Sequence, residues 1–175
     1  MRDSTKITRN PPYADTDVPY EKTKAQIEII LKSYGVKGIR WTSMEGQDDV
    51  LEFIVVANIQ GVQKQIGIAV NPPHIFLKKR YPGKGLVNTE NINQEYRLLF
   101  YWIKSKVEAV MWGLSTIEKE FLSQVTMKLP DGRTTSVGDV VLNLVGENRL
   151  QSLPFMGAQT ETSQNTKERK HVIDL

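Results

Sequence analysis

The longest regular pattern in the sequence is an apolar stripe between residues 89 and 113. Its members recur at steps of three and four, and they are Ile92, Tyr96, Leu99, Ile103, Val107 and Val110. This spacing places all of them on one face of a long amphipathic helix. A helix face of that length has to be buried against another layer of secondary structure. We therefore expect the helix to cover one side of a hydrophobic core.

The chain before this helix predicts one shorter helix and three strands. The helix covers residues 19–34, with Gly35 as its left-handed stop. The strands cover residues 39–44, 50–58 and 63–70, and short turns at residues 45–48 and 60–61 join them. Turns this short connect antiparallel neighbours. We predict an α+β fold, in which an antiparallel β-meander is packed against a long amphipathic helix and shorter helices.

After the long helix, the sequence predicts several short elements. Pro130-Asp131-Gly132 predicts a turn between two short strands, and the last helix is expected to end at Gly146. Two serines that are followed by an acidic residue three positions later indicate helix starts. They are Ser115 with Glu118, and Ser136 with Asp139.

Composition divides the chain into three parts. Residues 1–17 are polar and carry Arg2, Lys6 and Arg9, which predicts an extended basic arm. Residues 18–157 are expected to form a single α+β domain. Polar residues dominate residues 158–175, and we expect this tail to be disordered, because it has too little apolar surface to offset the entropy of ordering.

The residues needed for common catalytic sites are missing or poorly placed. The chain has no cysteine, which excludes thiol nucleophiles and thiolate zinc sites. Of its two histidines, His74 follows two prolines with no nucleophile motif nearby, and His171 lies in the tail. We interpret Asp48, Asp49 and Glu52 as part of a solvated turn rather than as metal ligands. We therefore expect no enzymatic activity, no metal and no cofactor.

Hydropathy gives no indication of a membrane protein. The apolar runs are too short to cross a bilayer, and the first residues are polar instead of forming a signal core. We expect a protein with no membrane partner that works in the cytoplasm, which is the host cell's cytoplasm if the protein is viral. The sequence leaves the oligomeric state open.

Positive charge is concentrated in one part of a chain whose net charge is only +3. No Asp or Glu lies between Glu52 and Glu90. The basic residues of this acid-free span are Lys64, Lys78, Lys79, Arg80 and Lys84. Most of them belong to residues 71–88, which we interpret as a loop. A surface with charge of one sign favours a polyanion, and a solvated basic strand and loop is the alternative interpretation.

Aromatic and basic residues occur together at two places, at Arg40-Trp41 and in residues 76–81. Single-stranded nucleic acid is typically bound by such a combination, because rings stack on bases while Lys and Arg contact phosphates. We predict that Arg40, Trp41, Tyr81 and the basic residues of the acid-free span bind nucleic acid. Burial of Trp41 on the inner face of the sheet is the alternative.

A second candidate site is Gln151, Leu153 and Phe155, in the segment QSLPF at residues 151–155. This spacing resembles the short peptide by which bacterial replication proteins dock on the sliding clamp. The resemblance implies that a sliding clamp or another replication protein is a partner. The alternative is that Leu153 and Phe155 pack onto the domain.

Three segments are also familiar as a set: PYADTDVPYEKTK at 12–24, IKSKVEAV at 103–110 and LPDGRT at 129–134. In this order they resemble an uncharacterised family of small proteins encoded by tailed phages and prophages. The resemblance covers most of residues 11–145 and implies a setting among phage replication and recombination genes. The basic segment at 71–88 and the longer tail depart from the family pattern.

The order of the expected elements also resembles crenarchaeal single-stranded-DNA-binding proteins that lack an OB fold. Those proteins set an antiparallel sheet against helices, but no binding residue carries over. Together these observations predict a nucleic-acid-binding accessory protein for single-stranded DNA, in phage-type replication or recombination. The alternative is a non-enzymatic adaptor of viral origin that binds another protein through the long helix.

Overall fold

The computed structural model describes residues 12–83 and 85–150, and within β4 it leaves the side chains of residues 78–81 undescribed. The chain divides into two compact units, Met1–Val140 and Val141–Leu175. The boundaries predicted at residues 17 and 157 stay predictions. Among the helices of the described residues, none has the length and apolar character needed to span a membrane.

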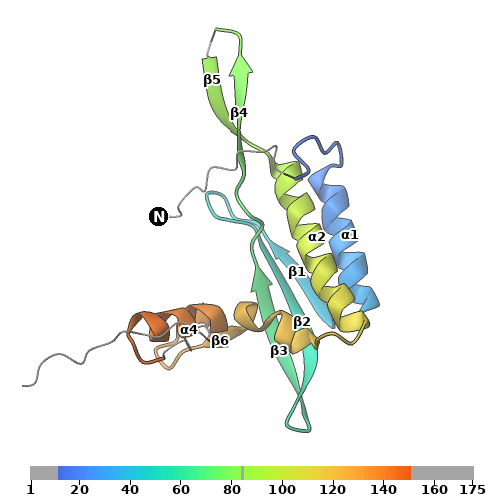
Figure 1. The fold of residues 1–175 in the computed structure, drawn as a ribbon, viewed down its shortest axis with the longest axis vertical. Helices are drawn as coiled ribbons and strands as arrows, with labels where there is room; N and C mark the ends of the chain where they lie inside the picture. Colours follow the sequence, from blue (N-terminus) through green and yellow to red (C-terminus); the bar gives the residue numbers. More distant parts are fainter. Residues whose placement is uncertain (1–11, 84, 151–175) are drawn as a thin grey trace, which may run out of the picture. The chain divides into compact units, whose positions relative to one another are not determined.

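A three-stranded antiparallel sheet forms the centre of the first unit (Figure 1). Its strands are β1 (Gly38–Thr42), β2 (Val50–Ile59) and β3 (Val62–Val70), in the order β1-β2-β3. In the register, Phe53 of β2 stands opposite Ile39 of β1 and Ile68 of β3. Because side chains alternate along a strand, these residues share one face of the sheet. The predicted meander is confirmed.

Two helices lie side by side over that face, α1 (Tyr20–Ser33) and α2 (Ile92–Met111) (Figure 1). The core between helices and sheet includes Ile27 and Leu31 of α1 and the stripe residues Leu99, Ile103 and Val107 of α2, all buried. Burying one such side chain contributes about 1.5–3 kcal/mol. The middle of the predicted stripe therefore holds α2 on the sheet, whereas Ile92 at its start is exposed.

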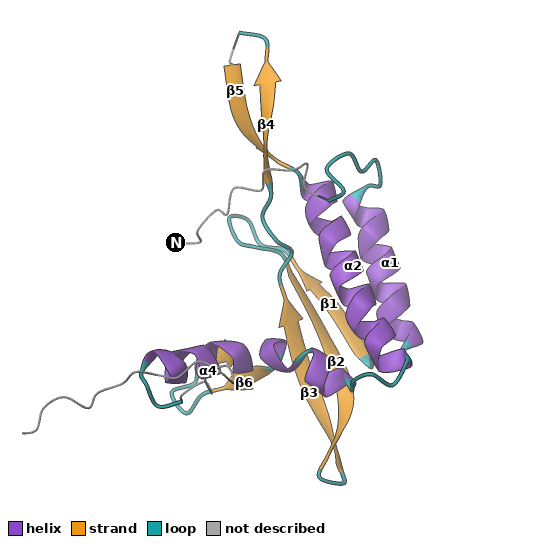
Figure 2. Cartoon of the chain, in the orientation of Figure 1, coloured by secondary structure: helices purple, strands orange, loops and turns teal. Residues whose placement is uncertain are grey.

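Only the first part of residues 71–88 is a loop, and most of the remainder forms strands, which corrects the prediction made for them. They contain β4 (Phe76–Tyr81), which pairs with β5 (Gly85–Glu90) as a two-stranded antiparallel hairpin. Figure 2 shows this β4–β5 hairpin as a ribbon of its own, outside the three-stranded sheet. Gly83 and Gly85 near its tip have φ of 79° and 70°, which glycine adopts without strain. The strands were missed because an uncovered charged ribbon lacks the apolar alternation of a half-buried strand.

Short elements follow α2: α3 (Ile117–Glu120), the 3-10 turn η1 (Leu122–Gln124), β6 (Thr126–Lys128), β7 (Thr134–Ser136) and α4 (Val137–Gly146). Strands β6 and β7 are paired around the turn predicted at residues 130–132. The cap predicted at Ser136 is confirmed, since its Oγ accepts the Asp139 N–H at 3.0 Å. The cap predicted at Ser115 is wrong, because Thr116 precedes α3 and makes no side-chain cap bond.

Candidate functional site

A cleft in the first unit gathers titratable side chains from three separate segments. Its cavity of about 180 Å³ is bordered by the turn after β1, by residues 72–74, and by the end of β5 with the first turns of α2. We call it the histidine–carboxylate cleft. Its titratable lining residues are Asp48, Asp49, His74, Glu90, Glu95 and Tyr96.

His74 is held between two carboxylates. Its Nε2 lies 2.8 Å from Asp48 Oδ1, and its Nδ1 lies 3.2 Å from Glu90 Oε1. These hydrogen bonds, first with Asp48 and then with Glu90, raise the pKa of His74 above its ordinary value. When His74 is protonated, both ring nitrogens donate and both contacts become charge-assisted.

Glu95 is the buried member of the cleft, with only 4% of its surface exposed. Its Oε1 accepts the backbone N–H of Ile75 at 2.7 Å, while the Ile75 carbonyl accepts the N–H of Asn91 at 2.9 Å. These bonds fasten the segment after His74 to the start of α2. Burial raises the pKa of Glu95, because a carboxylate loses hydration there.

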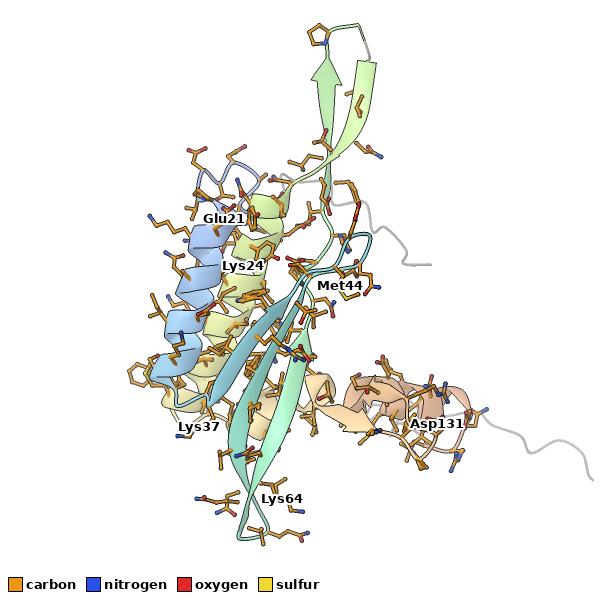
Figure 3. All side chains as sticks on the ribbon, turned by 180° about the vertical axis from the view of Figure 1, so that it is seen from behind. Glu21, Lys24, Lys37, Met44, Lys64 and Asp131 are labelled. Atoms are coloured by element: carbon orange, nitrogen blue, oxygen red, sulfur yellow. The ribbon has the colours of Figure 1, made fainter. Side chains whose placement is uncertain are left out.

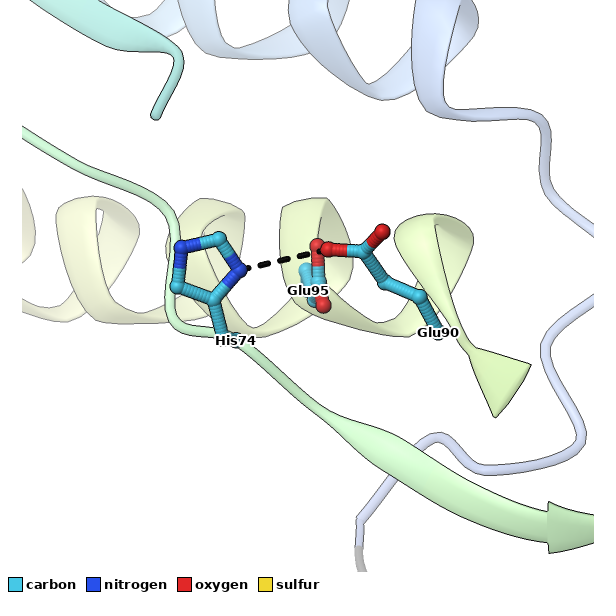
Figure 4. Close-up of side chains that lie close together, drawn as sticks. All are labelled: His74, Glu90 and Glu95. Atoms are coloured by element: carbon cyan, nitrogen blue, oxygen red, sulfur yellow. Dashed lines mark hydrogen bonds and ion pairs between the residues drawn. The ribbon is translucent and has the colours of Figure 1, made fainter. Parts of the chain in front are cut away.

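His74, Glu90 and Glu95 bring three potential ligand atoms together. These atoms all lie within 4.8 Å of one another, and Figure 4 shows the three side chains converging from the segment before β4, the end of β5 and α2. In sequence Glu90 is 16 residues from His74 and Glu95 is 21 residues from it. Only the β4–β5 hairpin, which leaves the cleft after His74 and returns at Glu90, brings them into contact.

Two further lining residues of the cleft, Asp49 and Tyr96, contact the Lys24 side chain. Lys24 Nζ lies 3.1 Å from Asp49 Oδ2, and the same oxygen accepts the Tyr96 hydroxyl. The Lys24 ammonium also lies 4.9 Å from the centre of the Tyr96 ring and 5.0 Å from that of Trp41, within range of cation–π attraction. Partial burial pushes the pKa of Asp49 upward, but hydrogen bonds from Ser43, Tyr96 and Lys24 outweigh it and leave the pKa lowered.

The residues predicted from the first strand to bind nucleic acid lie on opposite faces of the sheet. Trp41 is partly buried on the helix-covered face, with its ring 5.6 Å from the ring of Tyr96. The alternative given for it, burial on the inner face, is the observed arrangement. Arg40 stands on the other face, exposed, and its Nη2 pairs with Glu52 Oε2 at 2.6 Å. Its charge is thus largely matched by a neighbour on β2.

The remaining predicted residues lie elsewhere or outside the description. Lys64 is exposed on β3, close to the turn between β2 and β3 (Figure 3). Lys78, Lys79, Arg80 and Tyr81 belong to β4, so they are close in sequence but lie in a different sheet from Arg40 and Lys64. Lys84 and the predicted partner-binding residues Gln151, Leu153 and Phe155 lie outside the described residues.

The interpretation of Asp48 and Asp49 as part of a solvated turn is corrected, because both side chains have partners within the fold. Asp48 is exposed but engages His74, and Asp49 is half buried against Lys24 and Tyr96. The sequence signal for the cleft is weak, since it consists of a single histidine after two prolines with two glutamates further along. No spacing rule joins these residues without knowledge of the hairpin.

Comparison of the chain with protein-family models, with curated proteins and with solved structures gives no match. Two features stand out, and they share a boundary. One is the β4–β5 hairpin, which has no acidic residue between Phe76 and Thr89, and the other is the histidine–carboxylate cleft at its base, where Phe76 pairs with Glu90.

Proposed function

We propose that this protein binds nucleic acid, preferentially single strands, through the β4–β5 hairpin. The observation that carries the proposal is a two-stranded ribbon with four basic residues and no acidic residue between Phe76 and Thr89. The basic residues are Lys78, Lys79, Arg80 and Lys84. A cationic surface of one sign attracts the phosphate backbone and releases its counterions on binding.

The ribbon geometry supports contact along a strand. Successive residues of a β-strand rise by about 3.3 Å, so Lys78 and Arg80 are spaced by roughly 7 Å along β4. Phe76, on the same strand, is 60% exposed, and Tyr81 ends the strand. An exposed aromatic ring such as that of Phe76, on a strand with basic residues, favours single strands, because each stacked base contributes about 1–3 kcal/mol.

The proposed setting is that of an accessory protein in phage-type replication or recombination, acting in the host cytoplasm. It is supported by the three segments at residues 12–24, 103–110 and 129–134, which resemble the phage family. In this proposal the protein has no catalytic role of its own, and it holds single strands for other proteins. In the same proposal, residues 151–155 are the peptide that contacts a sliding clamp or another replication protein.

The test is fluorescence anisotropy with labelled single- and double-stranded DNA and RNA at several salt concentrations. We expect the wild-type protein to bind single-stranded DNA most tightly. Replacement of Lys78, Lys79 and Arg80 by alanine should weaken binding and flatten the log–log salt slope by about 2, because each lost single-strand contact removes about 0.7.

The chain offers a control of equal charge change. Lys22, Lys37 and Lys119 are exposed, and within the described residues none of them forms an ion pair. Their triple alanine variant lowers the net charge equally but leaves the hairpin unchanged, so its affinity should stay close to that of the wild type. Equal losses in both variants would mean that only overall charge matters. Absence of wild-type binding at low salt would refute the proposal.

A second candidate is the adaptor role, which one observation favours. Trp112, directly after α2, is 75% exposed, and Met111 and Leu114 beside it are exposed as well. A contiguous patch of large apolar residues on a protein surface often marks a site of interaction with another protein. The two functions differ in salt dependence, because an apolar contact does not release counterions. Trp112→Ala should then abolish partner binding while leaving any nucleic-acid binding intact.

A further inference from the structure

The histidine–carboxylate cleft has more carboxylates than the described residues around it balance with positive charge. Asp48, Glu90 and Glu95 all face His74, and within the described residues no Lys or Arg forms an ion pair with any of them. Lys24 is paired with Asp49, another residue that lines the cleft. Carboxylates of like charge repel one another at this range, and a bound cation would offset that repulsion.

Glu95 gives this argument an independent basis. The residue has only 4% of its surface exposed, lines the cavity and, among the described residues, receives one hydrogen bond on its carboxylate, from the Ile75 N–H. One backbone donor compensates only part of the cost of burying a charged carboxylate. A cation bound in the cavity would supply the charge partner that this carboxylate lacks among the described residues.

The outer contacts of the ligand atoms match those of metal-binding side chains. Asp48 Oδ1 contacts Nε2 of His74, and the other ring nitrogen, Nδ1, contacts Glu90 Oε1. The Ile75 N–H fixes the orientation of the Glu95 carboxylate. Metal-bound histidines usually donate their second N–H to a carboxylate or carbonyl, and this contact sets the ring and its tautomer.

The distances allow an ion with small side-chain movements. Donor atoms that lie about 2.1 Å from one ion are roughly 3–3.5 Å apart. The three donor atoms here lie within 4.8 Å of one another, and two of the three side chains, His74 and Glu90, are about half exposed and free to close on the buried third.

We propose that His74, Glu90 and Glu95 bind a divalent first-row transition-metal ion, with Asp48 as the outer partner of the histidine. One imidazole nitrogen with two carboxylates favours Zn²⁺ or Mn²⁺ over Mg²⁺ and Ca²⁺, whose sites are built mainly from oxygen. Zn²⁺ should bind more tightly than Mn²⁺, following the usual order of affinities. Three protein ligands leave at least one position for water or an anion. This proposal is independent of nucleic-acid binding.

The experiment is isothermal titration of the full-length, tag-free chain with ZnCl₂, after removal of metal by a chelator. The sequence provides a matched control, because it has two histidines, His74 and His171. The wild type and His171→Gln should each bind one Zn²⁺ saturably. His74→Gln should bind at least tenfold more weakly, and Asp48→Asn should lose about 10–100-fold, as outer partners of metal ligands usually do.

A second pair of variants distinguishes binding at the proposed ligands from nonspecific attraction of Zn²⁺ to acidic residues. Glu90→Gln removes a proposed ligand, whereas Glu45→Gln removes an exposed carboxylate of the β1–β2 turn that does not line the cavity. Only the first should lose affinity. Thermal melts without metal verify that each variant is folded. The proposal is overturned if the wild type shows no saturable binding, if His171→Gln is the variant that loses it, or if Glu90→Gln binds like Glu45→Gln.

Discussion

Phe121 lies where α3 leads into η1, and its side chain is fully buried in the core (0% exposed). Its ring stands edge-on to Phe53 of β2, with centroids 5.3 Å apart, and edge-on to Trp102 of α2, at 5.6 Å. One side chain therefore joins the sheet, the long helix and the segment that follows it. Its replacement by alanine tests this packing directly.

The expected cost can be worked out from these contacts. Burial of a phenylalanine side chain contributes about 1.5–3 kcal/mol, and each edge-to-face pair adds about 0.5–1.5 kcal/mol. Both estimates together agree with the roughly 3–5 kcal/mol measured for Phe→Ala in protein cores. We expect Phe121→Ala to lower the free energy of unfolding by about 4 kcal/mol. For a chain of 175 residues this corresponds to a fall in Tm of about 8–16 °C.

The assay is urea denaturation followed by tryptophan fluorescence, with Leu122→Ala as the matched neighbour. Leu122 is 54% exposed, so its truncation should cost less than about 1 kcal/mol. Phe121→Leu keeps an apolar group and should lose mainly the two aromatic pairs, about 1–3 kcal/mol. A loss below about 1.5 kcal/mol in Phe121→Ala, or equal losses in the two alanine variants, would refute the packing described here.

Two further predictions concern local interactions. The pKa of His74 is raised in the folded protein, first by Asp48 and then by Glu90. The protonated histidine therefore stabilises the fold fully below the unfolded pKa of about 6.5, and this stabilisation is lost as pH rises through the folded pKa. In metal-free protein, the Tm should therefore fall over this range more in the wild type than in His74→Gln, and parallel Tm curves would contradict the assignment. Ser136→Ala removes the bond from the Asp139 N–H and should cost about 0.5–2 kcal/mol, as measured by urea denaturation, whereas Ser115→Ala, at the cap that does not form, should leave stability nearly unchanged.

The central fold could be predicted because its determinants are local and periodic. The stripe of α2 and the β-branched residues of β2 indicate which residues face the core, and the short turns impose antiparallel pairing. The β4–β5 hairpin could not be predicted in the same way. Phe76 and Leu86 are exposed, and nothing in their pattern distinguishes two sides of a strand. A two-stranded ribbon held together mainly by backbone hydrogen bonds shows no apolar alternation in its sequence.

The cleft escaped prediction for a different reason. Asp48, His74 and Glu95 come from three segments whose approach depends on the path of the hairpin, and no short motif encodes that path. The position of Trp41 could not be predicted either. Alternation along β1 means that Trp41 and Arg40 face opposite sides of the sheet, but it does not determine which side the helices cover. The helix-covered side became known only with the register that places Trp41 opposite the buried Leu51.

The hairpin and the cleft are linked through the residues at the base of the ribbon. Phe76 pairs with Glu90, and His74 lies two residues before Phe76, so the contact between His74 and Glu90 closes the base of the hairpin. Beyond this point the ribbon carries its basic residues without an acidic neighbour. An isolated two-stranded hairpin is only marginally stable in water. Closure at the base, by the charged hydrogen bonds of His74 or by an ion held there, therefore stabilises the strands that present Lys78, Lys79 and Arg80.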